Sequence, residues 1–219
     1  MEMRSTNVRS GRIKRAFDLL LVAGGIVPAL PLMGIAALAV WLDDRGPVIY
    51  RQTRVGRDGV PFVVLKFRSM RSSNTGPLIT SGGDPRVTRV GKRLRAWKLD
   101  ELPQLLNVLR GDMSLVGPRP EVARYVEMMP EEFGQALRVR PGITDLASVI
   151  YRNESELLGQ STDPEKLYLE EILPHKLRLA RWYAEHRNLV LDLKIIMITV
   201  LNRPVRLDAE GYPALSLAA

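Results

Sequence analysis

The sequence predicts an α+β fold that is mainly helical, in which a membrane-associated helix precedes one small domain. Three observations predict it: the apolar segment Ala16–Leu42, two β-rich runs joined by an Asp-Gly turn, and several stretches of helical periodicity after residue 90. The 219 residues suffice for one domain with a hydrophobic core but not comfortably for two. We therefore expect a single domain over residues 1–219, with 16–42 in the membrane and 43–219 outside it.

The apolar segment Ala16–Leu42 contains one charged residue, Asp18, and lacks the small-residue cleavage pattern of a signal peptide. As a straight helix it would extend about 40 Å, which exceeds the roughly 30 Å hydrocarbon core of a bilayer. Pro28 and Pro31 lie in its middle, and proline kinks a helix because it removes a backbone donor. The segment therefore predicts a membrane helix that is not a simple straight span.

Basic residues flank this segment on both sides. Arg4, Arg9, Arg12, Lys14 and Arg15 precede it, and Arg45, Arg51, Arg54 and Arg57 follow it. Positive residues beside membrane helices favour the cytoplasmic side. A helix that breaks near Pro28 and returns to the same face would place both flanks there. A kinked helix that spans the bilayer and a buried core helix remain alternatives at this point.

Charge and cysteine content limit the chemistry that the chain can perform. Lys and Arg number 32 against 24 Asp and Glu, a formal charge of +8 that favours phosphates, nucleic acid or an acidic lipid surface as partners. The absence of cysteine excludes disulfides, zinc thiolates and cysteine nucleophiles, and the two histidines argue against a Ser-His-Asp triad. No GxxxxGK[ST] or GxGxxG motif is present. Any catalysis would therefore depend on carboxylates, cationic side chains and a hard metal ion.

The remainder of the chain predicts a β-hairpin, a long loop and several helices. Val48–Arg54 and Phe62–Phe67 flank the Asp-Gly turn and form the hairpin. Ser72–Arg86 is rich in Ser, Gly, Asn and Pro, which predicts a long mobile loop. Helical patterns cover Val90–Arg110 with a stop at Gly111, Glu121–Val139, and Pro164–Arg187 with a break at Pro174. Leu189–Leu201 is apolar and too short to span a bilayer, which suits a helix in the membrane interface.

The stretch Leu99–Leu109 (LDELPQLLNVL) places two adjacent carboxylates at the start of a helix. Because proline is tolerated only in the first helical turn, Pro103 puts Asp100 and Glu101 at or just before the N-terminus, where the helix dipole favours anions. Capping is the ordinary role of an aspartate in this position. Several cations close by in the sequence favour a catalytic role instead: Lys66, Arg68, Arg93, Arg95, Lys98 and Arg119.

Adjacent carboxylates among guanidinium groups are what a Mg²⁺-dependent phosphoryl site requires. One carboxylate can attack phosphorus, the other can hold the metal ion, and arginines can bind the phosphate oxygens. From the residue types and their spacing, the pair is a candidate for either helix capping or phosphoryl chemistry.

Four stretches, in this order, resemble the bacterial sugar transferase family, the small monotopic phosphoglycosyl transferases (polyprenyl-phosphate glycosyl-1-phosphate transferases). They are KRAFDLLL (Lys14–Leu21), GPVIYRQTRVGRDGVPFVVLKFRSM (Gly46–Met70), LDELPQLLNVLRGDMSLVGPRPE (Leu99–Glu121) and RPGIT (Arg140–Thr144). With Arg152 they cover most of the chain. Members of this family start the assembly of O-antigen, capsule, exopolysaccharide and glycoprotein glycans.

The resemblance implies a re-entrant membrane helix over 16–42, bent at Pro28, and a small cytoplasmic catalytic domain over 43–219 with a β-hairpin and amphipathic interfacial helices. The protein would lie in the bacterial inner membrane with its catalytic part on the cytoplasmic face. The implied partners are a UDP-sugar donor, a polyprenol (undecaprenyl) phosphate acceptor and the lipid bilayer, without nucleic acid. A homodimer is left open.

By the resemblance, Asp100 attacks the β-phosphate of a UDP-sugar, releases UMP and holds the phosphosugar covalently until polyprenol phosphate accepts it. Glu101 is expected to bind Mg²⁺, the implied cofactor. Arg95 matches the family's arginine before the carboxylate pair, and Pro118-Arg119-Pro120 matches its PRP motif. The residues expected to bind substrate or phosphate are Lys66, Arg68, Arg95, Pro118, Arg119, Pro120 and Arg152.

The chain departs from the family after the RPGIT motif. Where members commonly continue with GLAQVNGRN, this chain reads DLASVIYRN over Asp145–Asn153. Arg152 keeps the place of a phosphate-binding arginine, whereas Asp145, Ser148 and Tyr151 replace other residue types. We therefore expect the chemistry of the family at the carboxylate pair but infer no particular sugar donor.

Three other functions are weighed against this interpretation. A phosphatase or hydrolase acting on lipid-linked diphosphates could use the same carboxylates. A nucleic-acid-binding protein with Gly91–Arg110 as its recognition helix would explain the charge but not the apolar segment. A membrane scaffold with an inactive site disagrees with the intact Asp100-Glu101 pair.

Overall fold

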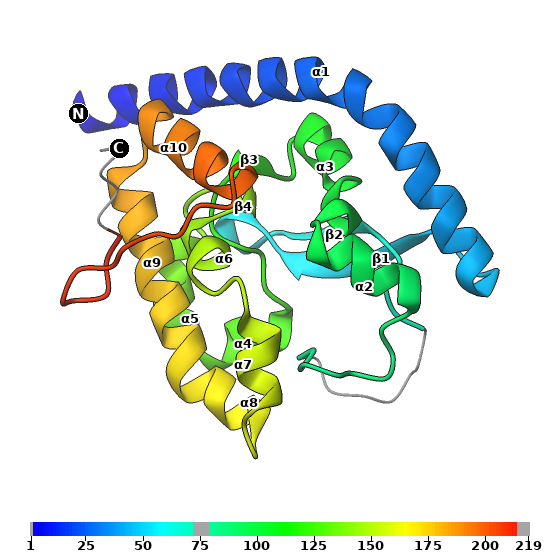
Figure 1. Cartoon of the computed structure of the whole chain (residues 1–219). Helices are drawn as coiled ribbons and strands as arrows, with labels where there is room; N and C mark the ends of the chain where they lie inside the picture. The colour runs from blue at the N-terminus through cyan, green and yellow to red at the C-terminus, as the bar shows by residue number, and fades with distance from the viewer. Residues whose placement is uncertain (1, 72–78, 214–219) are drawn as a thin grey trace.

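The computed structural model describes residues 2–71 and 79–213, with side chains from residue 11 onward. Within these residues, helices surround two small two-stranded sheets (Figure 1). The prediction of a mainly helical α+β fold is thereby confirmed. Residues 72–78 of the loop predicted over Ser72–Arg86 lie outside the described part of the chain.

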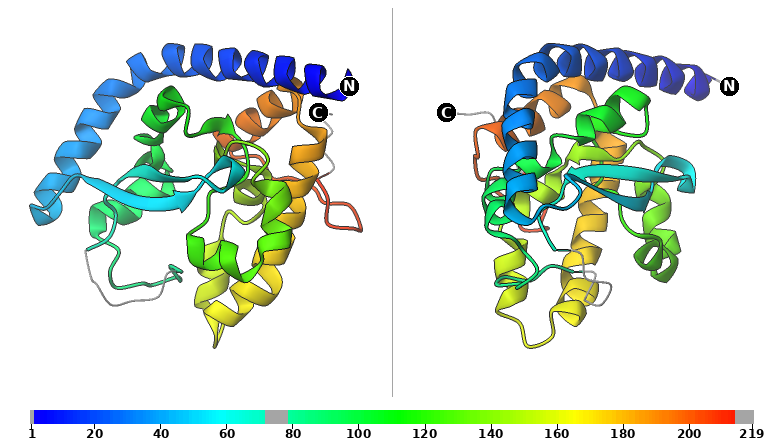
Figure 2. Two further views of the ribbon diagram at one scale, coloured as in Figure 1. Left: turned by 180° about the vertical axis from the view of Figure 1, so that it is seen from behind. Right: turned by 90° about the vertical axis from the view of Figure 1, so that its right-hand side faces the viewer.

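The membrane segment predicted over 16–42 is part of a longer helix, α1, which extends over Glu2–Asp44. Pro28 and Pro31 lie inside α1, and the helix is continuous through both while it bends about midway (Figures 1 and 2). A proline inside a helix removes one backbone hydrogen bond and bends the axis. Among the described residues, only Gly11–Asp44 forms a helix long and apolar enough to cross a membrane.

The two halves of α1 pack against different parts of the molecule. The first half lies over α10 (Leu189–Val200) and α3 (Gln104–Arg110), and the second half turns down beside α2 (Arg89–Ala96), as Figures 1 and 2 show. Lys14 Nζ lies 2.7 Å from Asp192 Oδ2 and thereby joins α1 to α10. The long helix is therefore docked on the rest of the chain along much of its length.

A buried polar network fixes the first half of α1. Asp18 is 2% exposed and accepts a hydrogen bond from Ser114 Oγ at 2.8 Å. Asp192 is fully buried and accepts a hydrogen bond from Tyr183 Oη at 2.6 Å in addition to its ion pair with Lys14. Buried carboxylates are tolerated when such partners satisfy them. The single charge of the apolar segment thus faces protein.

The predicted β-hairpin is confirmed as β1 (Ile49–Val55) and β2 (Pro61–Phe67), which pair antiparallel. Asn107 of α3 attaches to the edge of β2. Its Oδ1 accepts a hydrogen bond from Leu65 N at 3.1 Å, and its Nδ2 donates to Val63 O at 2.7 Å. This fully buried amide holds α3 beside the strand that contains Lys66.

The helix predicted over Val90–Arg110 is in fact three elements: α2, a 3₁₀ turn η2 (Leu99–Glu101), and α3. Lys98 separates the first two with a left-handed backbone, φ 54° and ψ 21°. Gly111, with φ 94°, ends α3 as predicted. Hydrophobic periodicity could not reveal the interruption because one left-handed residue leaves the apolar pattern on either side intact.

The helices predicted after residue 120 lie where the sequence predicts them, but they are divided differently along the chain. The stretch Glu121–Val139 is divided into α4 (Ala123–Met128) and α5 (Pro130–Ala136), because Pro130 keeps Met129 out of the helical region. Pro164–Arg187 is one helical run made of α8 (Pro164–Leu167), a π-helical turn η3 (Tyr168–Ile172) and α9 (Leu173–His186). The expected break at Pro174 is wrong, since this proline lies in the first turn of α9. The remaining helices are α6 (Leu146–Ile150) and α7 (Glu154–Gly159).

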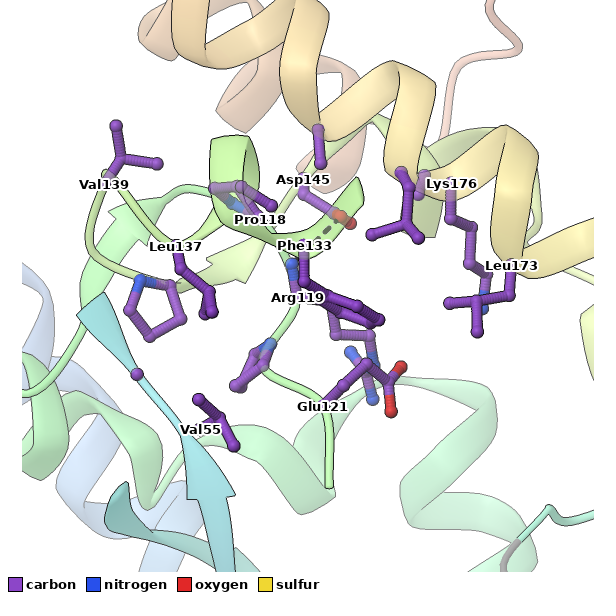
Figure 3. Close-up of a pocket in the computed structure, with 17 residues that line it drawn as sticks. Val55, Pro118, Arg119, Glu121, Phe133, Leu137, Val139, Asp145, Leu173 and Lys176 are labelled. Atoms are coloured by element: carbon purple, nitrogen blue, oxygen red, sulfur yellow. Dashed lines mark hydrogen bonds between the residues drawn. The ribbon is translucent and has the colours of Figure 1, made fainter. Parts of the chain in front are cut away.

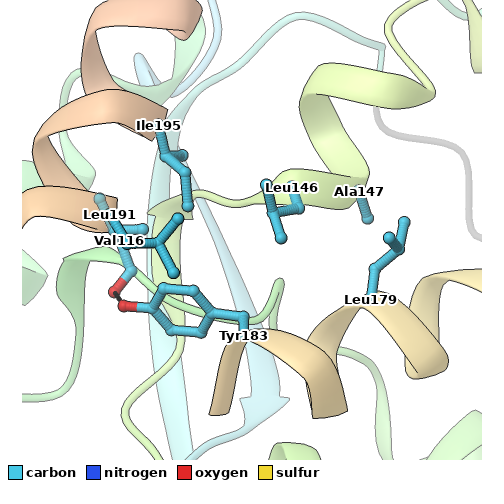
Figure 4. Close-up of a cluster of buried hydrophobic side chains, with 7 residues drawn as sticks. All are labelled: Val116, Leu146, Ala147, Leu179, Tyr183, Leu191 and Ile195. Atoms are coloured by element: carbon cyan, nitrogen blue, oxygen red, sulfur yellow. Dashed lines mark hydrogen bonds between the residues drawn. The ribbon is translucent and has the colours of Figure 1, made fainter. Parts of the chain in front are cut away.

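A second, parallel sheet of β3 (Ser114–Val116) and β4 (Gly142–Thr144) escaped the sequence prediction because each strand has three residues. One hydrophobic cluster packs α6, α9 and α10 against β3 (Figure 4); it contains Val116, Leu146, Ala147, Leu179, Tyr183, Leu191 and Ile195. Gly142 N donates to Pro118 O at 3.0 Å. The PRP and RPGIT motifs are therefore held side by side by this sheet.

Candidate active site

Asp100 and Glu101 lie in the 3₁₀ turn η2, between Lys98 and Pro103. Asp100 is 7% exposed, and the side chain of Glu101 is 13% exposed. The pair lies just before α3, which begins at Gln104, as the position of Pro103 predicted. The charged side chains that contact Glu101 come from other elements.

Glu101 is held by two cations from distant segments. Lys66 Nζ of β2 lies 2.8 Å from Glu101 Oε1, and Arg119 Nη2 lies 3.0 Å from the same oxygen. Burial opposes ionisation of Glu101, but the charges and hydrogen bonds of Arg119 and Lys66 outweigh it, so the pKa of Glu101 is well below its usual range. Glu101 is thus a permanently charged, fixed carboxylate.

Asp100 has a different environment, although it is the next residue. Burial raises the pKa of Asp100, and the negative charge of Glu101 raises it further. The positive charges of Lys66, Arg95 and Arg119 act in the opposite direction. Environments that separate the pKa values of two neighbouring carboxyl groups assign them different roles. Asp100 is thus the less stabilised of the two anions, and Glu101 is the one that cations hold.

Arg119 is positioned by its backbone as well as by its charge. Its amide N donates to Asp145 Oδ2 at 3.2 Å (Figure 3). Asp145 also caps α6 by accepting a hydrogen bond from Ser148 N at 2.7 Å. A side chain at Gly117 would meet Arg140 O at 2.2 Å, so the close approach of the two motifs requires glycine there. The attraction of Glu101 raises the pKa of Arg119, which therefore remains charged.

The role of Asp145 was not predicted from the sequence. The substitution relative to the family was visible, and Asp followed by Ser three residues later is a capping pattern that could have indicated a helix start. The second contact, to the Arg119 backbone, joins residues 26 positions apart and has no signal in the sequence.

Arg95 is the third predicted cation that the structure brings to the pair. Its Nε donates to Ser69 Oγ at 2.9 Å, and its Nη2 lies 3.0 Å from Met70 Sδ, both at the end of the hairpin. Burial lowers the pKa of Arg95, while Asp100 and Asp84 attract its charge. Arg95 of α2 is therefore close enough to Asp100 for the two charges to interact.

Two further predicted phosphate-binding residues, Arg68 and Arg152, form no ion pair with the two carboxylates. Arg68 forms an ion pair with Asp44 at the end of α1. It attaches the membrane helix to the hairpin, so direct phosphate binding by Arg68 has no support in its contacts. Arg152 lies at the edge of the site, where Nη2 donates to Arg203 O at 3.5 Å and its charge acts on Lys98.

The carboxylate pair fits a magnesium ion that is completed by substrate. No group of three or more His, Cys, Asp or Glu residues within the described ranges could by itself hold a metal. Mg²⁺ is commonly bound by one or two carboxylates together with waters and substrate phosphates. Both cations contact Oε1 of Glu101, so Oε2 is the oxygen left for a metal ligand. Asp100 and Glu101 therefore suit Mg²⁺ bound to a phosphorylated substrate.

A mainly apolar hollow adjoins the site behind Arg119 (Figure 3). Phe133 of α5, the following Leu137, and Leu173 and Leu177 of α9 line it, next to Pro118–Glu121. Pro120 O accepts a hydrogen bond from Arg54 Nη1 at 3.2 Å, and Pro118 O accepts one from Gly142 N. The backbone on both sides of Arg119 is therefore attached to neighbouring strands.

A buried carboxylate beside a fixed one, faced by Lys66, Arg95 and Arg119, defines a site for transfer of a phosphorylated group. The model of the bacterial sugar transferase family matches residues 9–204. The chain therefore belongs to the bacterial sugar transferase family, and it is an enzyme, a phosphoglycosyl transferase.

Its similarity to characterised relatives extends over most of its length. It is 43% identical over 194 residues to the UDP-glucose:undecaprenyl-phosphate glucose-1-phosphate transferase of Caulobacter vibrioides, covering 85% of this chain and 68% of that protein. It is 40% identical over 196 residues to the Escherichia coli K12 protein of the same name, covering 87% of this chain and 40% of that one. It is 37% identical over 206 residues to the exopolysaccharide production protein PSS of Rhizobium leguminosarum bv. phaseoli, covering 89% and 96%. The chain thus spans less than half of the E. coli relative and nearly all of the Rhizobium one.

Proposed function

We propose that this protein transfers a sugar-1-phosphate from a UDP-sugar to polyprenol (undecaprenyl) phosphate through a covalent intermediate on Asp100. The observation that supports the proposal most directly is the contrast between the two carboxylates. Asp100 is buried and poorly stabilised as an anion, whereas Glu101 is fixed by Lys66 and Arg119. The names of the relatives supply the classes of donor and acceptor.

In the first half-reaction, a carboxylate oxygen of Asp100 attacks the β-phosphorus of the donor. The bond from that phosphorus to the bridging oxygen breaks, and UMP leaves with the electron pair. In the second half-reaction, a phosphate oxygen of the acceptor attacks the same phosphorus, and the Asp100 carboxylate is regenerated. The product is a polyprenol-diphosphate sugar. Arg119 and Arg95 bind the phosphate oxygens, and Mg²⁺, when bound at Glu101, supplies neutralisation of the diphosphate charge.

The product class places the reaction at the first membrane step of bacterial polysaccharide or glycoconjugate assembly. The exopolysaccharide name of the Rhizobium relative supports this position. The relatives differ in the sugar they transfer, glucose in the Caulobacter protein and N-acetylgalactosamine in the Aeromonas hydrophila protein. No sugar is therefore proposed for this chain, and a homodimer stays a prediction.

We further propose that α1 is a re-entrant helix and that the remainder lies on the cytoplasmic face of the inner membrane. The bend of α1 and its exposed apolar side chains, such as Leu20, Val27 and Leu30, support insertion. Exposed residues of α10, including Val190 and Met197, form an apolar surface on the helix that underlies the first half of α1. A bilayer covering both helices would bring a lipid acceptor to the site.

Isotope exchange tests the proposed function. Labelled UMP incubated with the enzyme and its UDP-sugar should enter the donor in the absence of any lipid acceptor, because UMP can attack the covalent intermediate and reverse the first half-reaction. A hydrolase would instead consume the donor without exchange. Screening UDP-sugars for UMP release in the presence of undecaprenyl phosphate then identifies the donor.

Glu101→Gln should mainly impair the use of magnesium. The amide keeps the shape but loses the charge that a metal ion needs, so the Mg²⁺ concentration for half-maximal activity should rise about tenfold or more. Glu185→Gln, which alters an exposed i,i+4 ion pair on α9, is the matched control and should leave the Mg²⁺ dependence unchanged. A wild-type Mg²⁺ titration curve in Glu101→Gln would rule out the ligand role.

Cysteine labelling tests the membrane topology, since the chain has no cysteine of its own. Single cysteines at the exposed positions Arg12 and Arg51 should both react with a membrane-impermeant thiol reagent from the cytoplasmic side. A cysteine at Val27, 66% exposed in the isolated chain, should be protected by lipid. Labelling of positions 12 and 51 from opposite sides would establish a simple span instead.

A further inference from the structure

Lys98 has a left-handed backbone conformation, which is unfavourable for lysine. It lies between α2 and the carboxylate turn with φ 54° and ψ 21°. Side-chain-bearing residues are strained in this left-handed region, where glycine or asparagine is usual. Gly111 serves the same purpose at the end of α3, with φ 94°. A lysine in this strained position therefore indicates a function for its side chain.

The side chain of Lys98 reaches toward the segment in which this chain differs from the family pattern. Its Nζ lies 3.4 Å from Ser148 O, in the middle of the segment's helix α6. Partial desolvation lowers the pKa of Lys98, and the positive charges of Arg119 and Arg152 add to this effect, against the attraction of Glu101. Lys98, Arg119 and Arg152, from three separate stretches of the chain, are thus close enough for the charges of the two arginines to act on the lysine.

The site gathers charges of both signs. Its cations are Lys66, Arg95, Lys98, Arg119 and Arg152, and the carboxylates that act on them are Asp84, Asp100, Glu101, Glu121 and Asp145. Glu101 already pairs with Lys66 and Arg119, and Asp145 with the Arg119 backbone. Among the described residues, neither Lys98 nor Arg152 forms an ion pair with a carboxylate, since each donates to a backbone carbonyl instead. Their charges are therefore available to an anionic ligand.

Resting on the proposed function, we propose that Lys98, with Arg119 and Arg152, binds the phosphate monoester that leaves and enters opposite Asp100. This group is the phosphate of UMP in the first half-reaction and the phosphate of the polyprenol acceptor in the second. In-line displacement requires leaving and attacking oxygens to take the position opposite the nucleophile. Because Asp100 is the nucleophile in one direction and the leaving group in the other, both phosphates occupy the same place. Lys98 would thus be a binding residue for both half-reactions.

The variant Lys98→Gly separates binding from structure. It removes the side chain and at the same time relieves the strained backbone, so the melting temperature should not fall. The loss of a charge-assisted contact should weaken UMP binding, measured by calorimetry, by about ten- to a hundredfold and raise the KM for polyprenol phosphate similarly. Lys98→Arg should restore most of both. Lys92→Ala removes an exposed cation from α2 and is the control for net charge.

Two outcomes would overturn this inference. One is UMP binding and acceptor KM in Lys98→Gly that equal those of the wild type. The other is a lowered melting temperature in Lys98→Gly together with equally weakened UMP binding in Lys98→Arg. That combination would mean that the lysine only holds α6 through Ser148. Absence of UMP exchange in the wild-type enzyme would refute the proposed function, and the calorimetric comparison of Lys98→Gly with wild type would still decide the binding role.

Discussion

Replacing Asp100 with asparagine should abolish phosphosugar transfer while the protein still folds and inserts into membranes. The amide has the shape of the carboxylate but cannot attack phosphorus, and loss of a nucleophile costs on the order of 10⁴-fold or more in rate. Folding should survive because burial and the neighbouring Glu101 already disfavour the charge of Asp100. Both half-reactions require this carboxylate, so UMP exchange and transfer to lipid should fail together.

The measurement has two parts. The first is UMP exchange, assayed without acceptor. The second is intact-protein mass spectrometry after addition of UDP-sugar, which should detect a phosphosugar adduct on the wild type and none on Asp100→Asn. Asp58→Asn is the control, because Asp58 lies in the hairpin turn with a left-handed backbone that asparagine tolerates. Substantial exchange by Asp100→Asn would exclude this residue as the nucleophile.

Arg119→Ala should cause the second largest loss, about 10²- to 10³-fold in kcat/KM for the UDP-sugar. Two effects combine. The phosphate oxygens lose a guanidinium partner, and Glu101, 13% exposed, loses one of the two cations that hold its Oε1. The backbone contact of residue 119 to Asp145 does not depend on the side chain, so the loop itself should persist.

Steady-state kinetics with varied UDP-sugar and Mg²⁺ measure this loss. Arg119→Lys should recover only part of the activity, since a lysine supplies one point of contact where arginine supplies a fork. Arg124→Ala is the control for removal of an arginine, because Arg124 makes an exposed ion pair with Glu165 on the surface of α4. Wild-type kcat/KM in Arg119→Ala would contradict the assignment of this residue to phosphate binding.

The mainly helical fold, the hairpin and the identity of the carboxylate pair could all be predicted from the sequence. The β1–β2 hairpin follows from β-rich runs around Asp58-Gly59, a turn chemistry that is local. Lys66, Arg95 and Arg119 were predicted as cations of the site, and the structure brings all three to Asp100 and Glu101. These predictions succeeded because turn residues, apolar periodicity and linked motifs are properties of short stretches.

Other features depend on where the backbone turns. The prediction of a helical stretch over Val90–Arg110 did not include the left-handed backbone of Lys98, which separates the carboxylate pair from α2. Arg68, which is predicted to bind phosphate, forms an ion pair with Asp44 that the sequence did not indicate. Asp18 was assigned to a membrane segment, yet it is bonded to Ser114 inside the protein. Arg68 and Asp18 contact residues that are far away in the sequence, and the turn at Lys98 depends on the backbone angles of one residue. Local sequence patterns reveal neither.

By itself, the sequence determined which residues are chemically capable of the reaction: two adjacent carboxylates, several cations, no thiols, and an apolar helix with prolines. Only the tertiary structure decided that Glu101, and not Asp100, forms the ion pairs with Lys66 and Arg119. Lys66 lies in a strand and Arg119 in a loop, 35 and 18 residues away from Glu101 in the sequence, and both donate hydrogen bonds to its side chain. The pKa of a carboxyl group follows from burial and from charges within a few ångströms, and those distances are set by packing and not by order along the chain.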